Sequence, residues 1–131
     1  MTRKSAGLLI DADVMVEYLR GEDRAKTFLE SLDTRPATSA ICVAELFAGS
    51  RNDKERMAIE HFLMAFDVLP VDGDIAQLAG EYRKTYVRSH STGLADALVA
   101  ATAATYRLTL VTFNTKHYPM LPDVQVPYPR D

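Results

Sequence analysis

The stretch Gly7-Leu8-Leu9-Ile10-Asp11 decides the fold, because it is a short and fully apolar run that ends abruptly in an acid. A run of this length without polar alternation is typical of a strand that is buried on both faces of a parallel sheet. The segments Ala37–Cys42 and Leu108–Thr112 have a similar character. We therefore predict three central strands, from which the rest of the chain can be placed.

Helical patterns separate these strands. Asp13 is a suitable cap for a short helix through Leu19, which Gly21 would end. Val43–Ala48 is interpreted as another short helix, closed by Gly49. The longer helical patterns are Glu22–Leu32, Asp53–Phe66, Leu94–Tyr106 and a helix that Asp72 or Asp74 caps and that runs through Arg88.

The outer strands are less regular than the central ones. Val68–Val71 contains Pro70 and is predicted as an edge strand, because proline cannot donate to a sheet ladder. Val124–Val126 is a candidate for a last edge strand. Strands that alternate with helices indicate a mainly parallel sheet covered on both faces, so we predict a Rossmann-like three-layer α/β/α sandwich. We expect residues 1–131 to form one domain.

The composition limits the possible classes of protein. Hydrophobic residues make up 47% of the 131 residues, which suits a buried core, and no apolar run approaches the roughly 18 residues of a membrane span. We therefore expect a cytoplasmic protein without a membrane segment. Cys42 is the only cysteine, which excludes an intrachain disulfide and a cysteine-based zinc site. The net charge of -3 argues mildly against nucleic acid as a partner, unless the acids gather around bound cations.

Three acids are predicted to meet at one edge of this sheet. Asp11 ends the first strand, Glu45 lies in the first turn of the helix after the second strand, and Asp96 lies in the first turn of the Ala-rich helix. Ligands of open α/β sheets bind beyond the carboxyl ends of the strands. Asp13 follows Asp11 closely and is expected to point into the same cleft. Thr112 and Asn114, at the end of a late strand, are within reach of it.

Carboxylates that share a cleft repel each other, and a bound cation would neutralise them. Oxygen ligands suit Mg²⁺ or Mn²⁺ better than zinc. Two such ions about 3.5–4 Å apart can hold the attacking and leaving oxygens of a phosphodiester. The chemistry would then be hydrolysis by water that the ions activate, without a side-chain nucleophile. Taken singly, Asp13, Glu45 and Asp96 are also explained by the preference of acids for first helical turns.

Four segments resemble the motifs of PIN domains in order and spacing across almost the whole chain. The first is LLIDADV at residues 8–14, and the second is SAICVAEL at residues 39–46. The third is ADALVAATA at residues 95–103, and the fourth is LTLVTFNTKHY at residues 108–118. The length and these variants of the motifs look most like VapC-type toxins of toxin–antitoxin pairs.

The resemblance implies a PIN-like fold and a Mg²⁺- or Mn²⁺-dependent endoribonuclease. It also implies a homodimer held inactive by a small VapB-like antitoxin, and transfer RNA is one RNA target that it suggests. The family's catalytic and metal-binding acids fall on Asp11, Glu45 and Asp96. The chain departs from the pattern at Asp13, where the family usually has a small polar residue, and at Asn114 and His117, which replace a fourth acid.

Two other interpretations remain open. The missing fourth acid fits a catalytically weak PIN-like module that binds RNA or protein, although Asp13 is a candidate to compensate as a metal ligand. His117 is a candidate to contact the phosphate or to give a proton to a leaving oxygen. A phospho-acceptor signalling domain would need an adjacent acidic pair and a lysine at the end of a late strand. The late strand here ends instead in Val111-Thr112-Phe113.

Overall fold

The computed structural model describes residues 7–130. Among these residues, five strands form one sheet in the order β3-β2-β1-β4-β5, and every neighbouring pair is parallel. The predicted parallel α/β class is therefore confirmed. The strands are β1 (Leu8–Ile10), β2 (Ala37–Ser39), β3 (Asp67–Leu69), β4 (Thr109–Val111) and β5 (Val124–Gln125).

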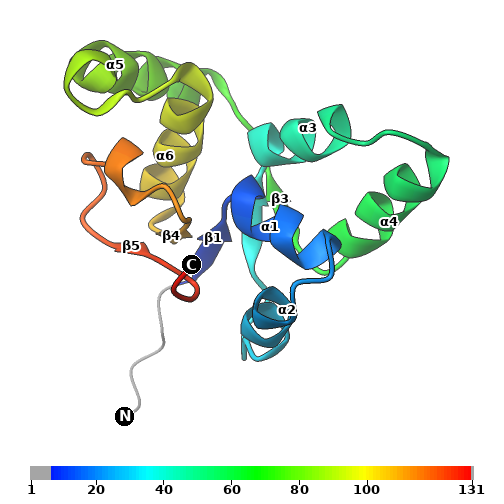
Figure 1. Cartoon of the computed structure of the whole chain (residues 1–131). Coiled ribbons are helices and arrows are strands. Elements are labelled where there is room, and N and C mark those ends of the chain that lie inside the picture. Colours follow the sequence, from blue (N-terminus) through cyan, green and yellow to red (C-terminus); the bar gives the residue numbers. More distant parts are fainter. Residues whose placement is uncertain (1–6, 131) are drawn as a thin grey trace.

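Six α-helices and one 3₁₀ turn connect the described strands and form the outer layers. Figure 1 shows α5 and α6 together on one side of the molecule and α1 to α4 on the other. The chain reverses its direction across the sheet after β3, because β4 lies beside β1. The helices are α1 (Ala12–Leu19), α2 (Asp23–Glu30), α3 (Ala40–Ala48), α4 (Asp53–Leu63), α5 (Gly73–His90) and α6 (Leu94–Tyr106), and the turn is Thr115–His117.

The outer strands lie at the edges of the sheet, as predicted, although β3 begins one residue earlier than expected and ends before Pro70. β3 precedes Pro70 and forms one edge of the sheet, and β5 forms the other. β1 lies at the centre between β2 and β4, and its Leu9 and Ile10 side chains are fully buried. The end of β1 is therefore the point toward which both halves of the sheet converge, and Asp11 follows it directly.

The Ala-rich helix α6 packs closely in the core because its buried side chains are small. Burial is complete for Ala97, Ala100, Ala101 and Ala103, which all belong to this helix. α5 and α6 lie against each other, and Ile75 and Ala79 of α5 form one apolar cluster with Ala97 and Ala101 of α6. Close packing fixes the start of α6, where Asp96 lies, against the rest of the fold.

The second strand is shorter than predicted. We expected a strand over Ala37–Cys42, but β2 ends at Ser39 and α3 begins at Ala40. The Ser39 hydroxyl accepts a hydrogen bond from the Ile41 amide at 3.1 Å and so caps α3. A short apolar run does not distinguish strand from buried helix, and this cap decides between them. As a consequence, Glu45 lies in the second turn of α3 and not in the first.

The first helix also begins earlier than predicted. Asp11, and not Asp13, is its N-cap, because Asp11 Oδ1 accepts a hydrogen bond from the Ala12 amide at 2.8 Å. Asp13 lies in the first turn. Gly21 follows the helix with a φ of 86°, a left-handed conformation that favours glycine. This glycine allows the tight turn into α2, as predicted.

No helix within residues 7–130 combines the length and the apolar character that a membrane crossing requires.

Candidate metal centre

Asp11 lies at the centre of the acidic group, between the ends of β1 and β4. Its side chain is buried, with 7% of the residue exposed. Oδ1 accepts from the Ala12 amide, and Oδ2 accepts from the Thr112 hydroxyl at 2.9 Å and from the Tyr118 hydroxyl at 3.0 Å. These contacts fix both carboxylate oxygens although their partners come from three separate segments of the chain.

Asp13 turns toward the loop that follows β4. Its Oδ2 accepts from the Phe113 amide at 3.0 Å, from Thr112 Oγ1 at 3.2 Å and from Asn114 Nδ2 at 3.3 Å. Among the described residues, Asp13 Oδ1 is one of two buried side-chain oxygens without a hydrogen-bond partner. One oxygen of Asp13 is therefore held in place while the other has nothing to accept from.

Asp96 reaches the same group from the start of α6. Its Oδ1 accepts from the Tyr118 hydroxyl at 3.1 Å, so this hydroxyl lies between Asp96 and Asp11. Its Oδ2 accepts from the Gly93 amide and lies 3.2 Å from His117 Nδ1. The Thr92 hydroxyl in turn donates to the His117 carbonyl oxygen at 2.8 Å. The 3₁₀ turn that carries His117 is thus tied to the start of α6.

Glu45 approaches Asp11 from α3, together with Cys42 one turn earlier. Asp11, Cys42 and Glu45 each offer one ligand atom, and these atoms all lie within 4.8 Å of one another. Cys42 is fully buried, and its Sγ is 3.6 Å from Asp11 Oδ1. Glu45 is the exposed member, so the group opens to solvent on this side.

Burial and mutual repulsion raise the pKa of three of the carboxyl groups. Burial is the largest cause at Asp11, Asp13 and Glu45 alike, and it raises the pKa of Asp13 to about 6. The Asp11 carboxylate further raises the pKa of both Asp13 and Glu45. Three ionised carboxylates are therefore unfavourable here unless a cation joins them.

The group has too few hydrogen-bond donors for its acceptors. Thr112 has one hydroxyl proton for Asp11 and Asp13, and Tyr118 has one for Asp11 and Asp96. Two hydroxyl protons are thus shared among three carboxylates, and Asp13 Oδ1 accepts from nothing. This shortage of positive charge fits a bound cation.

The donor set fits a hard cation with oxygen ligands. Burial raises the pKa of the Cys42 thiol, and the nearby Asp11 carboxylate raises it further, so the sulfur keeps its proton and donates to Asp11. Only a thiolate is a good metal ligand. The remaining donors are carboxylate oxygens, which suit Mg²⁺ or Mn²⁺.

The structure brings together all the site residues that the sequence singled out, including Thr112, Asn114 and His117. Their binding of a cation stays a prediction. Tyr118 was missed as a site residue, although its hydroxyl contacts two of the acids. The sequence provides little indication of this role, because it does not show where the hydroxyl of a tyrosine after His117 points. The contact of Cys42 with Asp11 was not foreseen either.

Comparison with known proteins agrees with this fold. The model of the PIN domain family matches residues 8–120. The chain belongs to the PIN domain family.

Curated relatives and solved structures narrow the comparison further. The chain is 39% identical to Ribonuclease VapC10 of Mycobacterium tuberculosis over 92% of each protein. It is also 39% identical to Ribonuclease VapC19 of the same organism, over 92% of this chain and 98% of the relative. A toxin–antitoxin complex from Klebsiella pneumoniae contains a chain that superposes with a TM-score of 0.80 at 30% identity, over 95% of this chain and 98% of that one.

Proposed function

We propose that this protein is a metal-dependent endoribonuclease and the toxin of a toxin–antitoxin pair. The observation that carries the proposal is the meeting of Asp11, Glu45 and Asp96 beyond the carboxyl end of β1, in a chain 39% identical to proteins named ribonucleases. Acids at this edge of an open α/β sheet lie where such folds bind their ligands. The substrate would be the phosphodiester backbone of RNA.

Asp11, Asp96 and Glu45 would hold the cation, with Asp13 as a further ligand through its unpartnered Oδ1. We propose Mg²⁺, with Mn²⁺ as a substitute, because the ligands are carboxylate oxygens. When bound, the ion would stabilise the negative charge that develops on the phosphate oxygens and would activate water.

The other residues of the site position these acids. Tyr118 keeps Asp11 and Asp96 facing each other, and Thr112 does the same for Asp11 and Asp13. Asp96 orients the His117 ring through Nδ1. His117 would then be placed to donate a proton to the leaving oxygen or to contact the phosphate.

A VapB-like antitoxin is the partner that the comparisons support, because the Klebsiella structure is a toxin–antitoxin complex. We propose that such an antitoxin holds the nuclease inactive, that the chain forms a homodimer, and that it acts on RNA in the cytoplasm. Transfer RNA is a candidate target.

One feature of the site favours the alternative of a catalytically weak module. The position after β4 carries Asn114, whose amide donates to Asp13 and brings no negative charge. A site with fewer acids binds a second cation less tightly, and this would leave an RNA- or protein-binding domain with little cleavage.

The experiment that separates these functions is a cleavage assay on mixed cellular RNA that includes transfer RNA. The purified chain is incubated with Mg²⁺ or Mn²⁺ and, in parallel, with a chelator. Asp96→Asn is compared with Asp74→Asn, because Asp74 also lies in the first turn of a helix but belongs to the exposed start of α5.

Metal-dependent cleavage that Asp96→Asn abolishes and Asp74→Asn leaves unchanged is the expected result. RNA binding without cleavage under all conditions would support the module instead. Cleavage that persists in the chelator would contradict a metal-dependent mechanism.

A further inference from the structure

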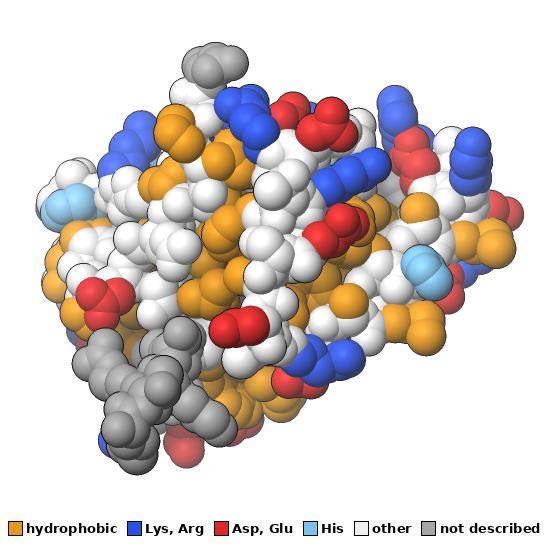
Figure 2. Space-filling view, turned by 90° about the horizontal axis from the view of Figure 1, so that it is seen from below, with side chains coloured by type: hydrophobic (Ala, Val, Ile, Leu, Met, Phe, Trp, Pro, Cys, Tyr) orange, Lys and Arg blue, Asp and Glu red, His pale blue; other side chains and the backbone are white. Residues whose placement is uncertain are grey.

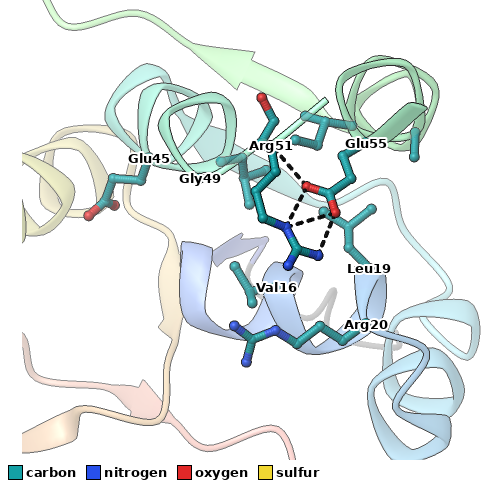
Figure 3. Close-up of a pocket in the computed structure, with 11 residues that line it drawn as sticks. Val16, Leu19, Arg20, Glu45, Gly49, Arg51 and Glu55 are labelled. Carbon is teal, nitrogen blue, oxygen red and sulfur yellow. Dashed lines mark hydrogen bonds and ion pairs between the residues drawn. The ribbon is translucent and has the colours of Figure 1, made fainter. Parts of the chain in front are cut away.

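A cavity of about 620 Å³ opens beside the acidic group, between α1, α3 and α4. Figure 3 shows Glu45 at one side of this cavity and the Arg51–Glu55 pair at the other. Its volume lies within the range of about 300–1,000 Å³ that is usual for small-ligand sites. Because Glu45 belongs to both, the cavity is continuous with the group of acids.

The cavity has an apolar lining that comes from all three helices. Leu46 and Ile59 form its buried part, with 3% and 5% of each residue exposed. Val16 and Leu19 of α1 and Ala58 of α4 complete this lining. An apolar wall of this kind fits a flat ring or a sugar, while the polar groups that orient a ligand lie at the rim.

Two arginines lie at the rim of the cavity, and they differ in their partners. Arg51 forms hydrogen bonds with both carboxylate oxygens of Glu55, the shortest at 2.6 Å, so its charge is balanced. The side chain of Arg20, at the C-terminal end of α1, forms no hydrogen bond or ion pair with any residue in 7–130. In Figure 3 its side chain extends past Val16 and not toward Arg51 and Glu55. Arg20 is thus an unpaired cation beside the acidic group.

We propose that this cavity binds a nucleotide of the RNA strand next to the scissile bond, with Arg20 contacting its phosphate and the apolar wall receiving its base or sugar. The proposal rests on the proposed ribonuclease function and extends it to the neighbouring part of the same strand. A guanidinium group presents paired donors that match phosphate oxygens. The acids would bind the scissile phosphate through cations, whereas Arg20 would contact the neighbouring phosphate directly.

The location of the charges favours RNA over a protein segment as the occupant. On the face that Figure 2 shows, lysines and arginines are scattered among acids and hydrophobic side chains and form no continuous basic track in the coloured part. Arg20 and Glu45 line the same cavity. Arg20 is therefore suited to bind a further phosphate of an RNA strand whose scissile phosphate lies at the acids. A protein segment could pack against the apolar wall. It would give Arg20 no anionic partner unless the segment itself carried an acidic residue.

The test measures RNA binding without cleavage. Asp96→Asn serves as the background, and binding of a fluorescein-labelled single-stranded RNA of mixed sequence is followed by fluorescence anisotropy over a range of salt. Removal of one phosphate contact on single-stranded RNA lowers the salt slope by about 0.7, which weakens binding about fivefold near 0.1 M salt. We expect this change from Arg20→Gln. Arg83→Gln is the matched control, because Arg83 is an exposed arginine on α5, on the other side of the molecule.

A second variant tests the cavity itself. Ala58→Trp places a large side chain into the cavity from the exposed side of α4, and we expect it to weaken RNA binding without the loss of salt slope. Unchanged affinity and slope in both Arg20→Gln and Ala58→Trp would overturn the proposal and leave the cavity to a protein segment. Metal-dependent cleavage by the unmodified chain would still support the proposed function in that case. If the unmodified chain neither bound nor cleaved RNA, both proposals would fall.

Discussion

Tyr118 places one hydroxyl group between two carboxylates that must hold the same cation. The hydroxyl is 3.0 Å from Asp11 Oδ2 and 3.1 Å from Asp96 Oδ1, and 2% of the residue is exposed. Burial and both carboxylates raise the pKa of Tyr118, so the group remains a donor at neutral pH. A buried donor in this position fixes the direction of two acids, Asp11 and Asp96, that are far apart in the sequence.

Tyr118→Phe removes this donor without changing the packing of the ring. Loss of a group that orients metal ligands lowers metal affinity by about 10- to 100-fold. We expect the Mn²⁺ concentration needed to raise the melting temperature to increase by that factor. Tyr86→Phe on α5 is the matched control, and equal Mn²⁺ affinity in all three proteins would contradict this role of Tyr118.

Asp13 makes the stability of the metal-free protein depend on pH. Its folded pKa is about 6 and its ordinary value is 3.8, so the folded state holds the proton more strongly than the unfolded state does. The contribution of Asp13 to stability is therefore fully present below its ordinary pKa and is lost as the pH rises through about 6. A cation bound to the site would offset this loss, because it favours the ionised carboxylates.

Asp13→Asn removes the titrating group and keeps an oxygen that can accept from the Phe113 amide. In the presence of a chelator, we expect the variant to have a higher melting temperature than the unmodified chain at about pH 7, and a weaker decrease between about pH 4 and pH 6. Thermal unfolding followed by circular dichroism measures both. Identical pH profiles of the two proteins would show that Asp13 does not titrate as described.

At the scale of elements, α3 matters because its start determines where Glu45 and Cys42 lie. Ser39 caps this helix directly after β2, with its side chain fully buried. The helix begins three residues earlier than the sequence indicated, which places Cys42 against Asp11 and Glu45 one turn further out, at the rim of the cavity. The geometry of the acidic group thus depends on a single capping hydroxyl.

Ser39→Ala should lower the free energy of unfolding by about 1 kcal/mol, the usual cost of losing an N-cap. Asn52→Ala is the matched control, because Asn52 caps α4 through the Glu55 amide at an exposed position away from the acids. Urea unfolding should show similar losses for both variants. RNA cleavage at a temperature where both are folded should decrease only in Ser39→Ala, and equal cleavage would contradict the importance of this cap for the site.

At the scale of the whole molecule, the C-terminal segment ties the first two helices to the loop after β4. The Tyr128 ring packs edge-on against Phe113 at 5.2 Å, and Arg24 lies 4.9 Å above it. Arg130 lies 4.1 Å above the Phe113 ring, and Arg24 also donates to the Pro129 carbonyl oxygen at 3.0 Å. Because the Phe113 amide donates to Asp13, this segment supports one wall of the site.

Tyr128→Ala should lower the free energy of unfolding by about 2 kcal/mol, through the loss of an aromatic pair and of a cation–π contact. Tyr106→Ala, at an exposed position at the end of α6, should change it by less than about 0.5 kcal/mol. Equilibrium urea unfolding compares the two. Equal stability of both variants would show that the segment does not hold the fold together.

Much of the acidic group could be predicted because it depends on local features of the sequence. An acid directly after a buried strand, as at Asp11, must lie at the carboxyl edge of the sheet, and so must Thr112 and Asn114 after β4. Asp96 was placed by the start of the Ala-rich helix. Glu45 was assigned to the correct helix but to the wrong turn, because the boundary between β2 and α3 depends on whether Ser39 caps a helix. The organisation of residues 1–131 as a single domain stays a prediction.

The sequence by itself determined the parallel sheet, its edge strands and the set of acids at its carboxyl edge, because apolar runs, proline and strand ends act locally. Only the tertiary structure decided that the Tyr118 hydroxyl lies between Asp11 and Asp96, and that Arg20, Leu46 and Ile59 line one cavity beside Glu45. These contacts join segments that are distant in the chain. The directions of these side chains depend on how the helices pack, and no local sequence pattern predicts that packing.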